Sequence, residues 1–197
     1  MKSHSFIFIG RSGCGKGTQI KLLEEYLKTK DPDHKAITIS TGEFLREFIT
    51  GPSLTQRMCN EAYGSGGLQP EFITVHMWVK PLVENYTGKE HIFFDGTPRK
   101  YHEAGVLQSV FSFYKLEKPW VINIDISVEE ATKRLLARKR MDDSEDDIRK
   151  RLAWYESDVV PTIGYYNDSA EYHFLKINGE RPIEEIHADI VKRLNLD

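Results

Sequence analysis

A glycine-rich segment follows the first apolar run of the sequence and contains one lysine. The apolar run is residues 6–9, and the segment, here called the glycine-rich loop, is residues 10–18, GRSGCGKGT. Glycines let the backbone turn tightly and point successive N–H groups inward, and the helix expected next adds the positive end of its dipole. This context predicts a nucleoside triphosphate site on Gly13, Cys14, Gly15, Lys16, Gly17 and Thr18, with Lys16 reaching the β and γ phosphates. The alternative is a glycine-rich turn beside one lysine.

The residue after Lys16 bears on how a metal ion would be held. It is Gly17, where most such loops have a serine or threonine that binds Mg²⁺, and Thr18 comes one residue late. Mg²⁺, the expected cofactor, would then depend on water molecules and on a carboxylate elsewhere. Asp95, at the end of an expected strand, is the candidate and would act through water. The alternative for Asp95 is a turn residue at a strand end.

Several arginines could neutralise a phosphoryl group in transit between two nucleotides. Such a transfer needs no nucleophilic side chain, because the acceptor phosphate is itself the nucleophile, but it needs cations where the two polyanions meet. Arginine suits this task, since its guanidinium binds phosphate oxygens in pairs. The candidates are Arg46, Arg99, Arg134, Arg138, Arg140 and Arg151. The alternative for each is a solvated surface charge, and Arg151 could pair with Asp147.

The elements that must position these residues alternate between strand and helix. Short apolar runs typical of buried strands occur at residues 6–9, 36–39, 91–95, 120–125 and 173–177, with helical stretches between them. This alternation predicts an α/β fold of three layers, in which helices cover both faces of a five-stranded parallel sheet. Ligands of such folds bind beyond the carboxyl ends of the strands, where the glycine-rich loop and Asp95 are expected.

Composition narrows the classes of function. The chain has 197 residues, about one domain's worth, and a formal net charge of −3, which argues against general binding to nucleic acid or membrane surfaces. Its two cysteines cannot form a disulfide framework, which favours a reducing, cytoplasmic setting. The apolar run near the N-terminus is too short for a signal peptide or a membrane anchor. The seven histidines show no metal-ligand spacing.

Four separated motifs occur in an order that carries a resemblance over almost the whole chain. They are residues 13–19, GCGKGTQ; residues 40–46, STGEFLR; residues 95–99, DGTPR; and Asp142 and Asp143 with Arg151. Together they resemble the adenylate kinase branch of the nucleoside monophosphate kinases. The resemblance implies a P-loop NTP hydrolase-like fold, a monomer, and reversible transfer of the γ-phosphoryl group from Mg·ATP to a nucleoside monophosphate. It also implies that residues 1–197 form a single kinase domain, with a monophosphate-binding insertion at 41–70 and a vestigial lid at 139–142.

The resemblance further implies a role for each candidate residue. Residues matching Arg46 and Arg99 hold the acceptor monophosphate, the one matching Arg134 lies over the donor adenine, and the match for Asp95 orders the waters of the metal. Those matching Arg138, Arg140 and Arg151 surround the transferred group. The expected catalytic residues are thus Lys16, Arg99, Arg138, Arg140 and Arg151, and the expected contacts of the monophosphate are Thr41, Arg46, Gly96, Arg99 and Glu103.

Two departures from the family pattern bear on the chemistry. Only three residues separate Arg138 from Asp142, so the lid is nearly absent, and we expect measurable ATP hydrolysis when no acceptor is present. Near the acceptor base, Glu103 stands where adenylate kinases have glutamine, and Thr97 stands where the family usually has phenylalanine. An ionised carboxylate only accepts hydrogen bonds, which suits guanine, whereas Thr41 is the residue that AMP-specific members tend to keep.

AMP is therefore the favoured acceptor, and GMP, CMP and UMP are the alternatives. Glu103 could also face solvent, with a backbone group reading the base. From another class of function, the chain could be a nucleotide-binding module that has lost catalysis. A Lys16→Ala variant separates these hypotheses, because a binding module has no turnover to lose.

Overall fold

A five-stranded parallel sheet forms the centre of the protein, with the strand order β2-β3-β1-β4-β5. The computed structural model describes residues 2–138 and 144–196. The strands are β1 (Ser5–Ile9), β2 (Ala36–Ser40), β3 (His91–Asp95), β4 (Trp120–Asp125) and β5 (His173–Asn178). All five strands expected from the apolar runs are present, so the predicted α/β fold is confirmed.

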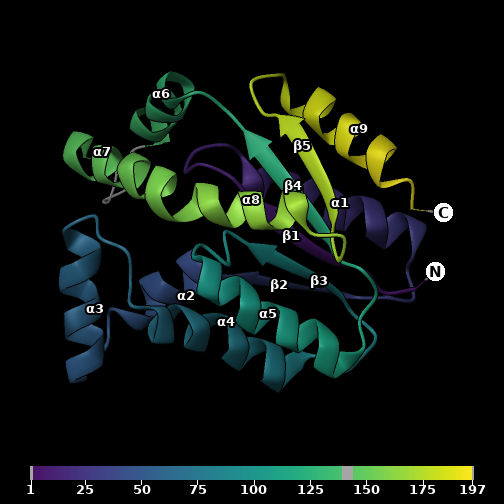
Figure 1. Ribbon diagram of the computed structural model, residues 1–197, viewed down its shortest axis with the longest axis horizontal. Helices are drawn as coiled ribbons and strands as arrows, with labels where there is room; N and C mark the ends of the chain where they lie inside the picture. Colours follow the sequence, from purple (N-terminus) through teal and green to yellow (C-terminus); the bar gives the residue numbers. More distant parts are fainter. Residues whose placement is uncertain (1, 139–143, 197) are drawn as a thin grey trace.

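Helices cover both faces of the sheet and give the molecule three layers (Figure 1). Their bounds are α1 (Lys16–Lys30), α2 (Thr41–Phe48), α3 (Leu54–Gly64), α4 (Glu71–Asn85), α5 (Tyr101–Tyr114), α6 (Val128–Arg138), α7 (Glu145–Trp154), α8 (Val160–Asp168) and α9 (Ile183–Leu194). A π-helical turn, Tyr155–Val159, joins α7 to α8. Helices α1 and α9 pack on one face of the sheet, and α4, α5 and α8 pack on the other. No helix in the described part of the chain is long and apolar enough to cross a membrane.

Alternation along β1 divides the hydrophobic core between the two faces. Phe6 and Phe8 pack in the cluster that contains the apolar side chains of α1 and α9, whereas Ile7 and Ile9 pack in the cluster around Trp78 of α4. These four β1 side chains are at most 2% exposed, because β1 has a paired strand on each side and helices above and below. A strand in this position reads as an unbroken apolar run, which explains why it could be recognised in the sequence.

The parallel register brings the carboxyl ends of the strands to one edge of the sheet. Phe8 of β1 lies opposite Asp95 at the end of β3 and opposite Ile122 of β4. The glycine-rich loop leaves this edge after β1, and α2 begins there directly after β2. The residues expected to bind nucleotides therefore start from the same edge.

Helices α2 and α3 extend away from the sheet, and α4 returns to it. Ser53 caps α3, because its hydroxyl accepts the N–H of Gln56 while the Gln56 side chain accepts the N–H of Ser53. Cys59, Ile73 and Met77 form a small apolar cluster between α3 and α4. The lid expected at residues 139–142 lies outside the described residues.

Candidate active site

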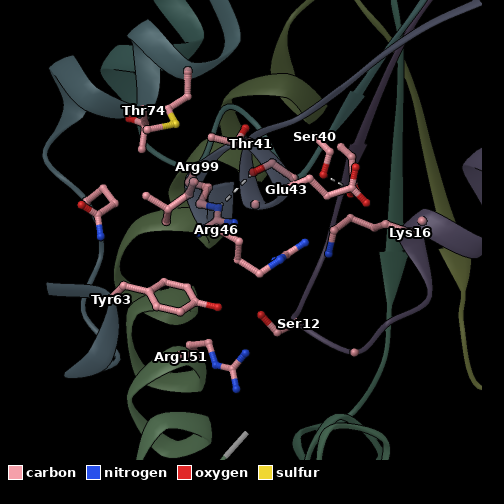
Figure 2. A pocket seen from close by; sticks show the side chains of 18 of the residues that line it. Ser12, Lys16, Ser40, Thr41, Glu43, Arg46, Tyr63, Thr74, Arg99 and Arg151 are labelled. Atoms are coloured by element: carbon pink, nitrogen blue, oxygen red, sulfur yellow. Dashed lines mark hydrogen bonds between the residues drawn. The ribbon is translucent and has the colours of Figure 1, made fainter. Parts of the chain in front are cut away.

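A cavity of about 630 Å³ opens at the carboxyl edge of the sheet (Figure 2). Its walls come from the glycine-rich loop, the junction of β2 and α2, helices α3 and α4, the segment after β3, and helices α6 and α7. The expected site residues that line it are Gly13, Gly15, Lys16, Gly17, Thr18, Thr41, Arg46, Asp95, Gly96, Arg99, Arg134, Arg138 and Arg151. The fold therefore gathers residues from distant parts of the sequence around one space.

The glycine-rich loop folds tightly around its own lysine. Gly13 has a φ of +84°, which favours glycine, and a Cβ on Gly10 would lie 2.3 Å from a backbone oxygen of β4. Lys16 Nζ donates to the carbonyl oxygens of Gly10 at 2.9 Å and of Arg11 at 3.1 Å. The ammonium group is thus held at the mouth of the loop, where a phosphate chain would lie.

Helix α1 begins at Lys16 and directs its N-terminal N–H groups toward the cavity. Gly15 at the N-cap has no side chain to cap the first turn, and that turn contains no acidic residue. An anion such as a phosphate oxygen is therefore the natural partner of these N–H groups and of the helix dipole. Cys14 is 1% exposed and is not among the lining residues, so any contribution to ATP binding falls to its backbone.

Asp95 faces the first turn of α1 across the cavity. Its Oδ2 lies 3.4 Å from the Ser40 hydroxyl and 3.9 Å from the point where a Cβ on Gly17 would be. The cavity wall here includes Asp95, Ser40 and Thr18, together with Gly17. The side chains of Asp95, Ser40 and Thr18 offer a metal ion oxygen atoms as ligands. This donor set fits Mg²⁺, which prefers oxygen ligands and keeps several of its waters.

Three arginines from separate elements bring positive charge to the cavity (Figure 2). They are Arg46 of α2, Arg99 in the segment after β3, and Arg151 of α7. Burial lowers the pKa of the Arg99 guanidinium; Glu103 and Asp95 oppose the shift, whereas the nearby charges of Arg151 and Arg46 add to it. Arg99 Nε donates to the Gly96 carbonyl at 3.0 Å. Such mutual proximity of like charges is the arrangement that binding of a polyanion would relieve.

Helix α6 contributes two further arginines to the wall. Arg134 donates through Nε to Glu130 Oε1 at 2.7 Å and through a terminal nitrogen to the Gly179 carbonyl at 3.0 Å. Arg138 lies one turn later and also lines the cavity. Arg140, expected to join them, lies outside the described residues.

Known proteins are similar to this chain over most of its length. The family model described as adenylate kinase matches residues 8–171. "Adenylate kinase 1" of Nostoc sp. is 34% identical over 180 residues, which cover 91% of this chain and 92% of that relative. "Adenylate kinase" of Leptospira biflexa is 32% identical over 192 residues, covering 95% and 98%, and that of Corynebacterium aurimucosum is 31% identical over 182 residues, covering 92% and 94%.

The chain belongs to the adenylate kinase family. It is a phosphotransferase, a nucleoside monophosphate kinase on the P-loop α/β fold that the sequence predicts.

Glu103 of this adenylate kinase family member is buried rather than solvated. It is 1% exposed and is not among the lining residues, so the alternative that Glu103 faces solvent is wrong. Glu103 Oε1 lies 2.7 Å from the Thr74 hydroxyl, and Oε2 accepts the backbone N–H of Arg99 at 3.0 Å. With both oxygens engaged inside the protein, the carboxylate braces Arg99 and Thr74, and this geometry offers no oxygen to an acceptor base.

Other lining residues were not anticipated from the sequence. Tyr63, Gln69 and Thr74 line the part of the cavity next to α3 and α4, and Trp154 lines the part next to α7. The Arg99 guanidinium lies 5.3 Å from the ring centroid of Trp154, within the range of a cation–π contact. No local motif marks these four residues, because each reaches the cavity through the packing of helices.

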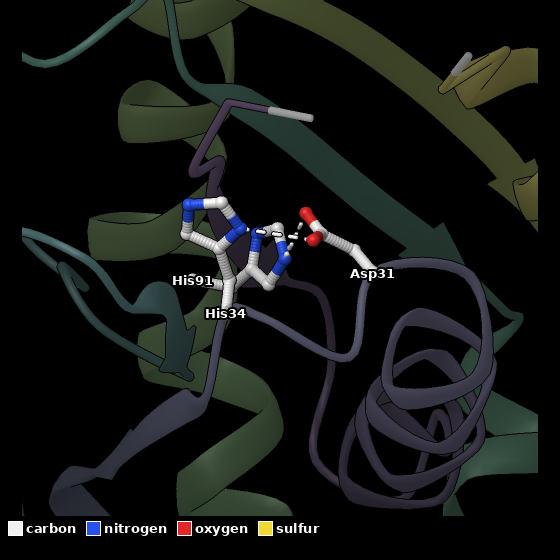
Figure 3. A group of neighbouring side chains, drawn as sticks. All are labelled: Asp31, His34 and His91. Carbon is white, nitrogen blue, oxygen red and sulfur yellow. Dashed lines mark hydrogen bonds and ion pairs between the residues drawn. The ribbon is translucent and has the colours of Figure 1, made fainter.

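A group of three side chains lies at the opposite edge of the sheet and consists of Asp31, His34 and His91 (Figure 3). Within the described part of the chain, it is the group whose potential ligand atoms lie close enough together to hold a metal ion. Metal-ligand spacing gave no sign of it, since His34 and His91 are far apart in the sequence. His34 Nδ1 lies 2.9 Å from Asp31 Oδ1, and His91 Nε2 lies 3.4 Å from Asp31 Oδ2. His91 Nδ1 accepts the N–H of His4, so the proton of a neutral His91 ring is on Nε2, toward Asp31.

The protonation of this group follows from one hydrogen bond, between His34 and Asp31, and one longer contact, between His91 and Asp31. Burial acts to raise the pKa of Asp31, but the hydrogen bond of His34 and the nearby imidazoles outweigh it and lower that pKa. An ionised Asp31 then accepts from His34 Nδ1, and Nε2 of His91 carries its proton. In this arrangement both central nitrogens direct protons toward Asp31, and the contacts join the end of α1 to the start of β3.

Proposed function

We propose that the chain transfers the γ-phosphoryl group of Mg·ATP reversibly to AMP and so forms two molecules of ADP. The observation that carries this proposal is the convergence of Lys16, Arg46, Arg99, Arg138 and Arg151 on one cavity above the start of α1. Two nucleotide polyanions need such a set of cations where they meet.

The donor triphosphate would lie on the glycine-rich loop. Backbone N–H groups of residues 13–18 would bind its oxygens, and Lys16 would exchange the carbonyls of Gly10 and Arg11 for the β and γ phosphates. Arg134 would lie beside the donor nucleotide, held by Glu130 and Gly179. Magnesium would be held through water by Asp95, with Ser40 and Thr18 beside it; when bound, it neutralises charge on the phosphates.

The acceptor monophosphate would lie between Arg46 and Arg99. We assign it to the segment 41–70, where α2 and α3 leave the sheet, and to the loop after β3. An oxygen of the acceptor phosphate forms a bond to the γ phosphorus while the bond from that phosphorus to the β–γ bridging oxygen breaks. Arg138 and Arg151 would stabilise the charge on the group between them.

The choice of AMP rests on Glu103. Guanine would be favoured by a free carboxylate near the base. Both oxygens of the Glu103 carboxylate instead contact Thr74 and Arg99. Thr41 lines the cavity at the start of α2 and keeps the residue type expected for an AMP acceptor.

A coupled assay with Mg·ATP and AMP, GMP, CMP or UMP in parallel tests this proposal. We expect kcat/KM to be at least about tenfold higher for AMP than for the others, a preference of about 1.4 kcal/mol. Lys16→Ala should lose turnover by about three orders of magnitude or more, whereas Lys28→Ala, an exposed lysine on the same helix, should match the wild type. A wild-type protein that binds ATP but phosphorylates no monophosphate would show a binding module instead.

A further inference from the structure

Arg11, in the glycine-rich loop, turns its side chain away from the cavity and into the protein. It is not a lining residue, and only 15% of its side chain is exposed. Its guanidinium stacks on the ring of Tyr155, 4.4 Å from the centroid. One terminal nitrogen pairs with Glu156, and the other lies 3.7 Å from Asp125 Oδ1.

Two of the partners of Arg11 directly follow α7, the helix that carries the opposite wall of the cavity, and the third, Asp125, ends β4. Tyr155 and Glu156 begin the π-helical turn directly after α7. Arg151 lies one helical turn before Tyr155, and Trp154 immediately precedes Tyr155. Arg151 and Trp154 both line the cavity. Tyr155 itself is 3% exposed and packs in the core, so the ring under Arg11 is fixed.

We propose that Arg11 is a positioning residue that holds the donor loop at a set distance from Arg151 and Trp154. The inference rests on the proposed function, in which the loop holds the donor phosphates and Arg151 stabilises the transferred group. One planar guanidinium makes the aromatic contact and both carboxylate contacts, and a lysine ammonium cannot reproduce all three at once. Because a displacement of about 1 Å can cost about 100-fold in rate, such a clamp acts on the transfer step.

Arg11→Met tests the proposal, since methionine keeps an apolar stem and removes the fork. We expect kcat for the transfer to fall about 10- to 100-fold, while KM for both nucleotides stays within about threefold of wild type. Arg11→Lys should recover less than half of the loss on a logarithmic scale. Arg149→Met, on the exposed face of α7, is the matched control and should leave kcat unchanged.

A double-mutant cycle with Glu156→Gln locates the path of the effect. If Arg11 acts through this contact, the double variant should be no slower than Arg11→Met alone. Equal kcat in Arg11→Met and wild type, full rescue by lysine, or additive losses in the cycle would overturn the proposal.

Hydrogen exchange provides a readout that does not depend on activity. Backbone amides of the glycine-rich loop and of residues 151–160 should exchange faster in Arg11→Met than in Arg149→Met. Unchanged exchange in both segments would refute the clamp even if the wild-type protein transferred no phosphoryl group, an outcome that would refute the proposed function separately.

Discussion

Replacing Glu103 with glutamine or with alanine distinguishes a bracing carboxylate from one that reads the acceptor base. Glutamine keeps an oxygen to accept the Arg99 N–H, and its amide can donate to the Thr74 hydroxyl oxygen. Thr74 can then direct its own proton to the Glu71 carbonyl, 2.9 Å away. The contacts with Arg99 and Thr74 keep a partner, and what is lost is the negative charge beside the Arg99 guanidinium, so we expect Glu103→Gln to cost about 1 kcal/mol of unfolding free energy.

Alanine removes the same charge as glutamine and, in addition, leaves the Arg99 N–H without its acceptor. Hydrogen bonds to a charged group contribute about 1.5–3 kcal/mol, and a buried unpaired donor costs about 1–3 kcal/mol. We therefore expect Glu103→Ala to lose about 3 kcal/mol, or about 6–12 °C in Tm for a chain of this size. Glu84→Gln, on an exposed position of α4, is the control.

Thermal unfolding and the acceptor assay together measure both effects. The ratio of kcat/KM for AMP to that for GMP should change less than about threefold in Glu103→Gln. A change of tenfold or more, about 1.4 kcal/mol, with Tm unaltered would place the carboxylate against the base and refute this reasoning.

Three other expectations follow from the site and the core. Arg99→Lys should lower kcat/KM for AMP by about 100-fold with little change in KM for ATP, because lysine loses the paired contacts of the guanidinium; steady-state kinetics with each substrate varied checks this. Burial lowers the pKa of His91 to about 4, and the charge of His4 lowers it further in the same direction. As the pH drops below about 6.5, His91 therefore takes up a proton in the unfolded chain before it does so in the folded one, and the free energy of unfolding falls. Between pH 7 and pH 5, wild type should lose about 2 kcal/mol more than His91→Asn in urea unfolding, and a His102→Asn control, 81% exposed, should behave as wild type. Since only three residues separate Arg138 from Asp142, ATP should be hydrolysed measurably without an acceptor, and a background rate would contradict this.

The fold could be predicted because its signals are local. The inner strands β1 and β3 are buried on both faces and therefore appear as unbroken apolar runs, whereas the edge strands β2 and β5 also carry exposed residues. The glycine-rich loop carries its lysine and glycines within nine residues. The arginines lacked such a local signal, since each alone resembles a surface charge. Only their order along the chain pointed to one cavity.

The remaining features depend on contacts between distant segments. Glu103 could be placed near the acceptor site, but its engagement by Thr74 depends on how α4 packs against α5. The contact of His91 with Asp31 likewise arises from the register of β3 beside the end of α1. Trp154 reads as a core residue and reaches the cavity because α7 lies over it. Tertiary packing decides these cases, and no spacing along the sequence encodes it.

Following the γ-phosphorus of ATP tests the central claim most directly. With γ-labelled ATP and unlabelled AMP, the account predicts that the label appears in the β position of ADP, in an amount equal to the AMP consumed, and that Lys16→Ala abolishes this transfer. Label recovered only as free phosphate, with AMP unchanged, would contradict the account.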